Sequence, residues 1–180
     1  PFPAGGGKTV AVTGQAVTNT GSVTGNYAGP LCPTGGTSCW PSLYEWIDKL
    51  HTGAGGGGKT VGTTDVKDPT KATAAATAAD YVVLVVDNAR DGGGEGHDRY
   101  SVALSTDQIA VCEAVLAVGK PTVLVMVNGG AISIDGLKDK APAIIEAFMP
   151  GVHGPQAIAE TIFGQNNPGG KLPVTIYKSD

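Results

Sequence analysis

The sequence carries little charge, and neither sign dominates it. Only 16% of its 180 residues are charged, and the formal net charge is −4. Nucleic acids and anionic membrane surfaces are bound by basic faces, so both are poor partners for this chain. No apolar run approaches the roughly 20 residues that a membrane-spanning helix needs. The sequence therefore predicts no nucleic-acid partner and no membrane span.

Cysteine and histidine are also sparse, with three of each in the chain. Their spacing matches no zinc motif and the histidines lie far apart, so we predict neither a metal site nor a cofactor. Cys32 and Cys39 flank six residues rich in Pro, Gly and Thr, where a small-loop disulfide and two free thiols are equally compatible with the sequence. An extracellular location would favour the disulfide. Cys112 lies on the apolar face of a predicted helix and is expected to be an inert core thiol.

The chain begins at Pro1, with neither a methionine nor a signal-like segment. One interpretation is a processed or trimmed chain, and the other is a secreted protein whose signal peptide has been removed. We expect a protein that acts outside the cell.

What the sequence does contain is a regular alternation of apolar runs and helical patterns. Hydrophobic residues make up 41% of the 180 residues, enough for one domain with a proper core. We predict strands at 9–13, 60–64, 81–86, 121–127, 143–148 and 172–177, the last at an edge, and helices at 42–50, 71–79, 107–118 and 154–163. The alternation is typical of an α/β fold, a single three-layer α/β/α sandwich with a mostly parallel sheet of about six strands. Residues 14–41 are rich in Gly, Thr and Pro and are expected to form a long surface loop.

The chain is organised around one apolar run that opens into a charged loop. Residues 81–86 carry no polar residue other than the first tyrosine, and Asp87 begins a glycine-rich segment that ends in EGHDR at residues 95–99. An open α/β sheet presents its chemistry on such loops, at the carboxyl ends of its strands. Right-handed crossovers bring the loop after Val127 to the same edge, so Asn128 is expected near the charged loop.

Residues 53–60, GAGGGGKT, fit the phosphate-loop pattern G-x4-G-K-T letter for letter. That loop holds phosphate between a preceding strand and a following helix, because the helix amino terminus helps to bind the phosphates. Here a predicted helix precedes the match and a predicted strand follows it. Residues 4–10, AGGGKTV, repeat most of the pattern before another strand. We therefore interpret both as glycine turns that feed strands, and not as nucleotide sites.

Several long stretches are specific enough to indicate a family. They are ADYVVLVVDNARDGGGEGHDR, LSTDQIAVCEAV, KPTVLVMVNGGAISI and PGVHGPQAIAETIFGQNNPGGKLPVTIY, with VAVTG and GNYAGPLC nearer the amino terminus. Together they resemble the C-terminal α/β-sandwich domain of glycoside hydrolase family 3, the β-glucosidases and β-xylosidases. The resemblance covers nearly the whole chain and is weakest between residues 33 and 71.

The resemblance implies that hydrolysis is shared between two domains. In that family a (β/α)8 barrel supplies an aspartate nucleophile, and the sandwich domain lends a glutamate as acid/base from a loop. Glu95 matches that glutamate, and other members carry an additional Glu two residues earlier, where this chain has Gly93. Asp98 and Arg99 match the family's D-R pair, which we interpret as an ion pair that fixes the loop.

The number of carboxylates limits what the chain can do alone. A retaining glycosidase needs two carboxyl groups about 5 Å apart, and Glu95 supplies one. A barrel needs at least ~200 residues of its own, so the second carboxylate would come from elsewhere. Asp87, Asp91 and Asp98 lie near Glu95 in the sequence, but we do not expect any of them to act as its partner.

Three functions remain open. The first is a stand-alone extracellular module that binds glycan or has a structural role and does not hydrolyse. The second is the acid/base-contributing part of a two-part β-glucosidase or β-xylosidase, with a separate barrel chain. The third is a self-associating structural subunit of an extracellular assembly. For Glu95 itself, a sugar contact and a solvated carboxylate with no task are equally compatible with the sequence.

Carbohydrate, if it is the partner, is expected at the strand-end edge, where the loops after parallel strands converge. The candidate contacts are Glu95, Asp98, Arg99 and Asn128, with Tyr27 or Trp40 as a stacking face. The simpler interpretation of Trp40 is an aromatic side chain that anchors its loop or packs in the core.

Overall fold

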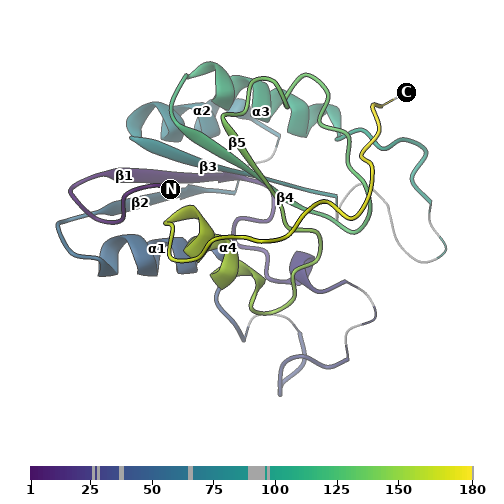
Figure 1. The fold of residues 1–180 in the computed structure, drawn as a ribbon, viewed down its shortest axis with the longest axis horizontal. Coiled ribbons are helices and arrows are strands. Elements are labelled where there is room, and N and C mark those ends of the chain that lie inside the picture. Colours follow the sequence, from purple (N-terminus) through teal and green to yellow (C-terminus); the bar gives the residue numbers. More distant parts are fainter. Residues whose placement is uncertain are drawn as a thin grey trace.

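The structure is a computed structural model that describes residues 1–25, 27, 29–36, 39–64, 67–88, 96 and 98–179. Its described part contains a sheet of five parallel strands in the order β2-β1-β3-β4-β5. The strands are β1 (Thr9–Gly14), β2 (Lys59–Thr63), β3 (Tyr81–Asp87), β4 (Thr122–Val127) and β5 (Ala143–Glu146), and the helices are η1 (Gly21–Val23, a 3-10 turn), α1 (Leu43–Gly53), α2 (Pro69–Ala78), α3 (Thr106–Ala117) and α4 (Gly154–Ile162). Helices α2 and α3 cover one face of the sheet, and α1 and α4 cover the other (Figure 1). The predicted three-layer α/β/α sandwich is confirmed.

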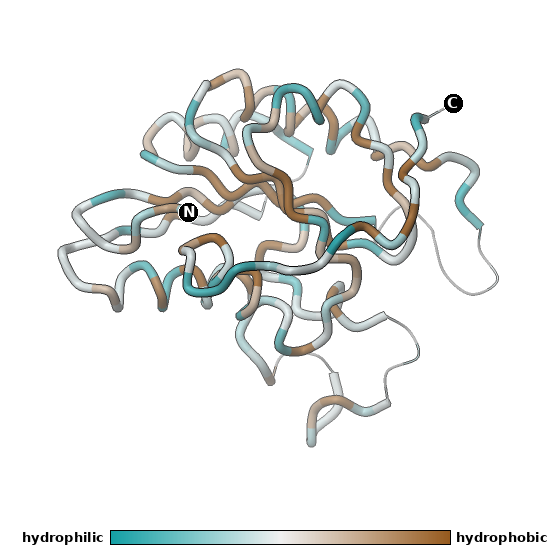
Figure 2. Tube along the Cα trace, viewed as in Figure 1, coloured by the Kyte–Doolittle hydropathy of each residue, from teal (hydrophilic) through white to brown (hydrophobic). Residues whose placement is uncertain are grey.

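Strand β3 lies at the centre of the core because it is apolar on both faces. Val82 and Leu84 pack with side chains of α2 and α3, whereas Val83 and Val85 pack with side chains of α1 and α4. All four are buried. Figure 2 shows the central strands as the most hydrophobic part of the chain. A continuous apolar run, rather than an alternating one, is what a parallel strand covered on both faces requires.

Local polar contacts determine where the helices begin. The Ser42 hydroxyl accepts the Glu45 N–H (3.3 Å) and the Glu45 carboxylate accepts the Ser42 N–H (2.7 Å), so both ends of a capping box are present at α1. Helix α2 begins at Pro69, before the predicted start. The reason is that Asp68 accepts the Thr70 N–H (2.9 Å) and that proline fits a first helical turn.

Two glycine turns lie against each other at the amino-terminal edge of the sheet. Gly5 has a φ of +69°, and a side chain there would overlap the Gly55 carbonyl. The Gly5 N–H donates to Nδ1 of the buried His51 (3.1 Å), which ties this turn to α1. Helix α1 precedes the GAGGGGKT segment and β2 follows it, so the predicted order of elements is confirmed. The segment is a turn between helix and strand.

The predicted edge strand at residues 172–177 is wrong. Beyond α4 the chain runs past β5 without joining the sheet, so the described sheet has five strands where about six were predicted (Figure 1). A groove of about 1360 Å³ lies between β5, α4 and this segment. Pro173 has no N–H to donate to a strand ladder, which weakens pairing in the middle of the run. The segment is tethered near its end, where the Ser179 N–H donates to the Asp135 carboxylate (2.8 Å).

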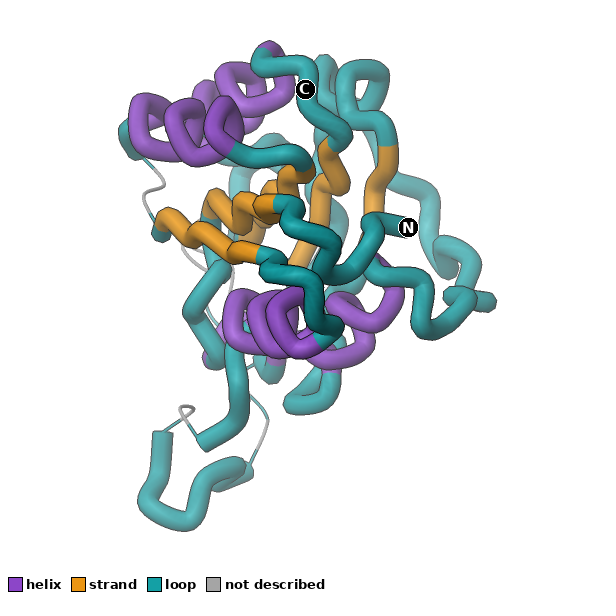
Figure 3. The backbone as a smooth tube through the Cα atoms, turned by 90° about the vertical axis from the view of Figure 1, so that its left-hand side faces the viewer, coloured by secondary structure: helices purple, strands orange, loops and turns teal. Residues whose placement is uncertain are grey.

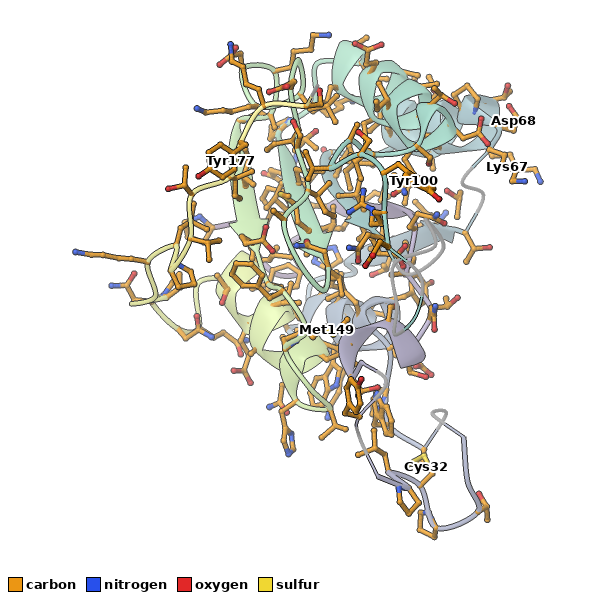
Figure 4. The ribbon with its side chains drawn as sticks, turned by 90° about the vertical axis from the view of Figure 1, so that its right-hand side faces the viewer. Cys32, Lys67, Asp68, Tyr100, Met149 and Tyr177 are labelled. Carbon is orange, nitrogen blue, oxygen red and sulfur yellow. A yellow bond between two sulfur atoms is a disulfide. The ribbon has the colours of Figure 1, made fainter. Side chains whose placement is uncertain are left out.

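The long loop between β1 and α1 has a fixed base and a projecting lobe. At its base, the Gly151 N–H donates to the Val23 carbonyl (2.8 Å) next to η1. Farther along, Cys32 and Cys39 are joined by a disulfide. Figure 3 and Figure 4 show the disulfide-bonded part projecting away from the sandwich. The lobe is therefore held to the body through its base.

Candidate functional site

The order of the strands reverses between β1 and β3. From β1 the chain goes to β2 on one side, and from β2 it crosses to β3 on the other. In open α/β sheets, ligands bind at such a switch point, outside the carboxyl ends of the strands. The charged loop leaves the sheet there, at the end of β3. Glu95 lies outside the described residues, whereas the two ends of the loop that carries it are described.

The incoming end of the charged loop is held from two directions. The side-chain amide of Gln108, on α3, donates to the Asp87 carbonyl (2.9 Å) and accepts the Asp87 N–H (3.2 Å). The Asn88 side chain accepts the Gly129 N–H at 3.1 Å. Asp87, Asn88 and Gln108 are all buried. Strand β3 therefore ends at a fixed point beside the loop that follows β4.

The outgoing end of the charged loop is held by Arg99. The guanidinium donates to the carbonyl oxygens of Ala103 (2.7 Å) and Ala131 (3.4 Å). Asp98 is exposed, and no ion pair among the described residues joins it to Arg99. The interpretation of these two residues as an ion pair is therefore wrong, because the guanidinium donates its hydrogen bonds to main-chain carbonyls instead. One of them belongs to the loop after β4, so Arg99 and Asn128 do come to the same edge.

Asn128 lies at the expected edge but is buried within a turn. Its side chain is 1% exposed, and its amide group donates to the Gly130 carbonyl (2.7 Å). Its main-chain N–H donates to the Phe148 carbonyl (3.0 Å), in the loop after β5. The first bond closes the turn after β4, and the second connects that turn to the loop after β5. Asn128 therefore stabilises the backbone of these two loops.

Glu146, the last residue of β5, is a carboxylate that was not predicted. One of its oxygens accepts the Phe148 N–H (2.9 Å), and the other is buried with no hydrogen-bond partner in the described part of the chain. Burial raises the pKa of the Glu146 carboxyl, and this outweighs the lowering by the hydrogen bond from the Phe148 N–H. The available signal was an acidic residue inside the apolar run AIIEAF.

Tyr100 is an exposed aromatic residue beside the charged loop, and it was not predicted either. It follows Arg99 directly and is fully exposed, and Figure 4 shows it far from the disulfide lobe marked by Cys32. Tyr27 is 83% exposed and Trp40 is half-buried, but both flank that lobe in the sequence. Tyr100 thus lies nearer to Arg99 than either predicted aromatic. An aromatic residue directly after EGHDR was the signal that could have indicated it.

The described residues include one free thiol, at Cys112, but no cluster of metal ligands and no helix able to span a membrane. No group of three or more His, Cys, Asp or Glu side chains there is placed to hold a metal ion. Burial raises the pKa of the Cys112 thiol to about 12, so this thiol remains protonated and unreactive at neutral pH. None of the described helices combines the length and the apolar character needed to cross a membrane.

Known proteins match the chain over most of its length. The family model of the glycosyl hydrolase family 3 C-terminal domain matches residues 1–180. Beta-D-xylosidase 1 of Arabidopsis thaliana is 36% identical in an alignment of 176 residues, which covers 96% of this chain and 22% of that protein. The periplasmic beta-glucosidase of Salmonella typhimurium is 37% identical over 109 residues, 61% of this chain and 14% of that protein.

Solved structures show the same fold. The beta-glucosidase from Listeria innocua superposes with a TM-score of 0.81 at 21% identity, over 99% of this chain and 24% of that one. The chain thus spans less than a quarter of the length of each of these relatives. The family match over all 180 residues confirms the resemblance seen in the sequence: the chain belongs to the glycosyl hydrolase family 3 C-terminal domain family.

Proposed function

We propose that the chain is the sugar-binding sandwich part of a β-xylosidase or β-glucosidase, and that it does not hydrolyse glycosides by itself. The main support is that both ends of the loop carrying Glu95 are anchored at the carboxyl edge, beside the switch point of the sheet. Relatives named as β-xylosidases and as a β-glucosidase support a β-xyloside or β-glucoside as the ligand.

Within this site, one group of residues contacts the sugar, and a second group holds the backbone of the first group in place. Glu95 is the acid/base carboxylate of the family pattern, and the exposed Asp98 accepts hydrogen bonds from sugar hydroxyls. Tyr100 offers an exposed aromatic face on which a pyranose ring stacks. Arg99 and Asn128 hold the backbone of this edge, because both donate hydrogen bonds to main-chain carbonyls.

The number of carboxylates supports the absence of hydrolysis by the chain alone. A retaining glycosidase places two carboxyl groups about 5 Å apart across the anomeric carbon. At this edge, Asp87 is buried at the end of β3, and Glu146 is bonded within the turn after β5. Neither is open to a sugar. Asp98 is exposed, but its proposed task is to accept hydrogen bonds from sugar hydroxyls. The nucleophile of the family pattern is an aspartate of the barrel, so we propose that the nucleophile comes from a barrel outside this sequence. The relatives are long enough to contain one, since this chain matches only 22% of the Arabidopsis thaliana xylosidase.

We also propose that the protein works outside the reducing cytosol. The Cys32–Cys39 disulfide supports this, because small-loop disulfides persist in oxidising compartments. The Salmonella typhimurium relative is named a periplasmic enzyme, which points the same way.

Calorimetric titration of the chain with xylobiose and cellobiose tests the proposed function. We expect binding of at least one of them, weakened about tenfold by Tyr100→Ala through loss of the stacked ring. Tyr177→Ala removes another exposed aromatic residue, beyond α4, and should change nothing. No binding by the unaltered chain, or equal losses in the two variants, would contradict the proposal, as would release of nitrophenol from an aryl β-xyloside by the chain alone.

A further inference from the structure

The segment that leaves the charged loop is bound to the segment that follows β4. The Ser133 N–H donates to the Val102 carbonyl (2.8 Å), and Ala103 and Ser133 form an isolated parallel bridge. This pairing lies outside the described five-stranded sheet. It fixes the outgoing end of the charged loop against its neighbour at the carboxyl edge.

Arg99 connects the same two segments through its side chain. One terminal nitrogen donates to the Ala103 carbonyl at 2.7 Å, and the other donates to the Ala131 carbonyl at 3.4 Å. The Ala103 oxygen belongs to the segment that leaves the charged loop, and the Ala131 oxygen belongs to the segment that follows β4. The guanidinium therefore bridges the two paired segments. A planar guanidinium carries five N–H donors in a rigid fork and holds two acceptors at once, which a single ammonium group on a flexible stem does less well.

We propose that Arg99 is a positioning residue that fixes the outgoing end of the loop carrying Glu95, acting through main-chain carbonyls of its own segment and of the neighbouring loop. This inference rests on the role proposed above for Glu95. An extended chain spans about 3.5 Å per residue, so an anchor at Arg99 keeps Glu95 within roughly 14 Å of it. The next described hydrogen bond to the segment that follows β4 is at the Val102 carbonyl, and an anchor there sets a limit of roughly 25 Å.

Backbone relaxation measured by NMR on the chain without sugar tests the inference. In Arg99→Gln, we expect the order parameters of residues 98–101 to fall below about 0.6, the range of a flexible backbone, while those of β3 stay unchanged. Arg99→Lys keeps the charge without the fork and should lie between Arg99→Gln and the unaltered chain. Asp98→Asn is the matched control, because Asp98 is adjacent and exposed, and it should match the unaltered chain.

Two results would overturn the inference. One is an unchanged order parameter throughout residues 98–101 in Arg99→Gln, and the other is an equal loss of order in Asp98→Asn. If Arg99→Gln does not fold, Arg99→Lys carries the test, and unchanged order in that variant overturns the inference as well.

A xylobiose titration of the same variants separates this inference from the proposed function. If both are correct, Arg99→Gln binds about tenfold more weakly than the unaltered chain, because the loop is no longer held in place. Loss of order in Arg99→Gln with no sugar binding by the unaltered chain would support the role of Arg99 and contradict the proposed function. If Arg99→Gln binds xylobiose as well as the unaltered chain does and keeps the same backbone order parameters, the proposed function would be supported and the role of Arg99 contradicted.

Discussion

In the proposed hydrolase, Glu95 is one of the two carboxylates that the reaction takes, and its proposed task is to protonate the leaving group. In the barrel-containing hydrolase proposed above, we expect Glu95→Gln to lower kcat/KM for an alkyl β-xyloside by about 10²–10⁴, the usual contribution of a general acid. A dinitrophenyl xyloside should be affected much less in the glycosylation step, because its leaving group departs without a proton. Asp91→Asn, on the same loop, is the control and should leave both substrates unaffected. Equal losses for the two substrates in single-turnover measurements would contradict this role for Glu95.

Glu146 gives a prediction about stability because its side chain is half-buried and one of its carboxylate oxygens has no hydrogen-bond partner in the described part of the chain. Burial raises the pKa of Glu146 above its ordinary value of 4.5, so the folded state disfavours the ionised form. The folded protein is then favoured at low pH, and this contribution is lost as the pH rises from 4.5 through the raised pKa. Glu146→Gln removes the charge and keeps an acceptor for the Phe148 N–H.

We therefore expect Glu146→Gln to raise the free energy of unfolding at pH 7 by less than about 1 kcal/mol, because the side chain is half-buried and solvent screens its charge, and to raise it by still less at pH 4. Urea unfolding at the two pH values measures this. The control is Glu113→Gln, which removes an exposed carboxylate paired with Lys140 and should give no such gain. A larger gain at pH 4 than at pH 7 would show that the sign of the pKa shift is wrong.

The sequence could identify the residues of the EGHDR segment but not all of their partners. Glu95, Asp98 and Arg99 are recognisable because residue type and spacing carry the family pattern. The partners of Arg99 are main-chain oxygens, one of them 32 residues away, and every residue offers such an oxygen. No sequence pattern distinguishes the acceptor, so the expected pair with Asp98 was wrong. Tyr100 was missed because its place beside the edge depends on the path of the backbone.

Among the elements, α1 and the segment beyond α4 show where local signals suffice and where they fail. The start of α1 was predictable because Ser42 and Glu45 are three residues apart and complete their capping box within one turn. Residues 172–177 alternate like an edge strand, but a strand also needs a partner with matching donors and acceptors. That requirement is not local, and Pro173 removes a donor from the run.

The segment beyond α4 offers a prediction about pH, because it is tethered at Asp135. The carboxylate accepts the Ser179 N–H (2.8 Å) and hydroxyl (3.1 Å), and the bond from the N–H contributes most to lowering the pKa of Asp135. The lowered pKa means that the tether is fully present above the ordinary value of 3.8 and is lost as the pH falls through the lowered value.

We expect the amide chemical shift of Ser179, followed by NMR from pH 6 to pH 2, to report this titration at a pH below about 3.8. Asp135→Asn should abolish the titration. Asp139→Asn changes an exposed carboxylate nearby in sequence and should leave it in place. A Ser179 amide that does not respond to pH in the unaltered chain, or one that titrates above pH 4, would contradict the tether.

At the scale of the whole molecule, the alternation of strands and helices predicted the layers but not the order of the strands. Any alternating chain with right-handed crossovers can place a new strand on either side of its predecessor. The reversal between β1 and β3 depends on which helices pack together, and α2 packs on α3 while α1 packs on α4. The position of the switch point, and with it the edge that carries the site, became visible only in the fold.

The whole molecule also presents two other places where a ligand could be held. One is the groove of about 1360 Å³ between β5, α4 and the segment beyond α4. The other is the disulfide lobe, with the exposed Leu31 near its cysteine. The described ends of the charged loop do not line the groove, and the lobe projects away from the sandwich, so both serve as internal controls for where sugar binds.

Chemical-shift mapping of xylobiose on the isotopically labelled chain tests the central proposal most directly. We predict that the amides of Asp98, Arg99, Tyr100 and Gly129, at the carboxyl edge, shift most. Shifts confined to residues 143–146 and 172–177 would place the sugar in the groove, and shifts confined to residues 31–36 would place it on the lobe. Either pattern, or no shift at saturating sugar, would contradict a carbohydrate site at this edge.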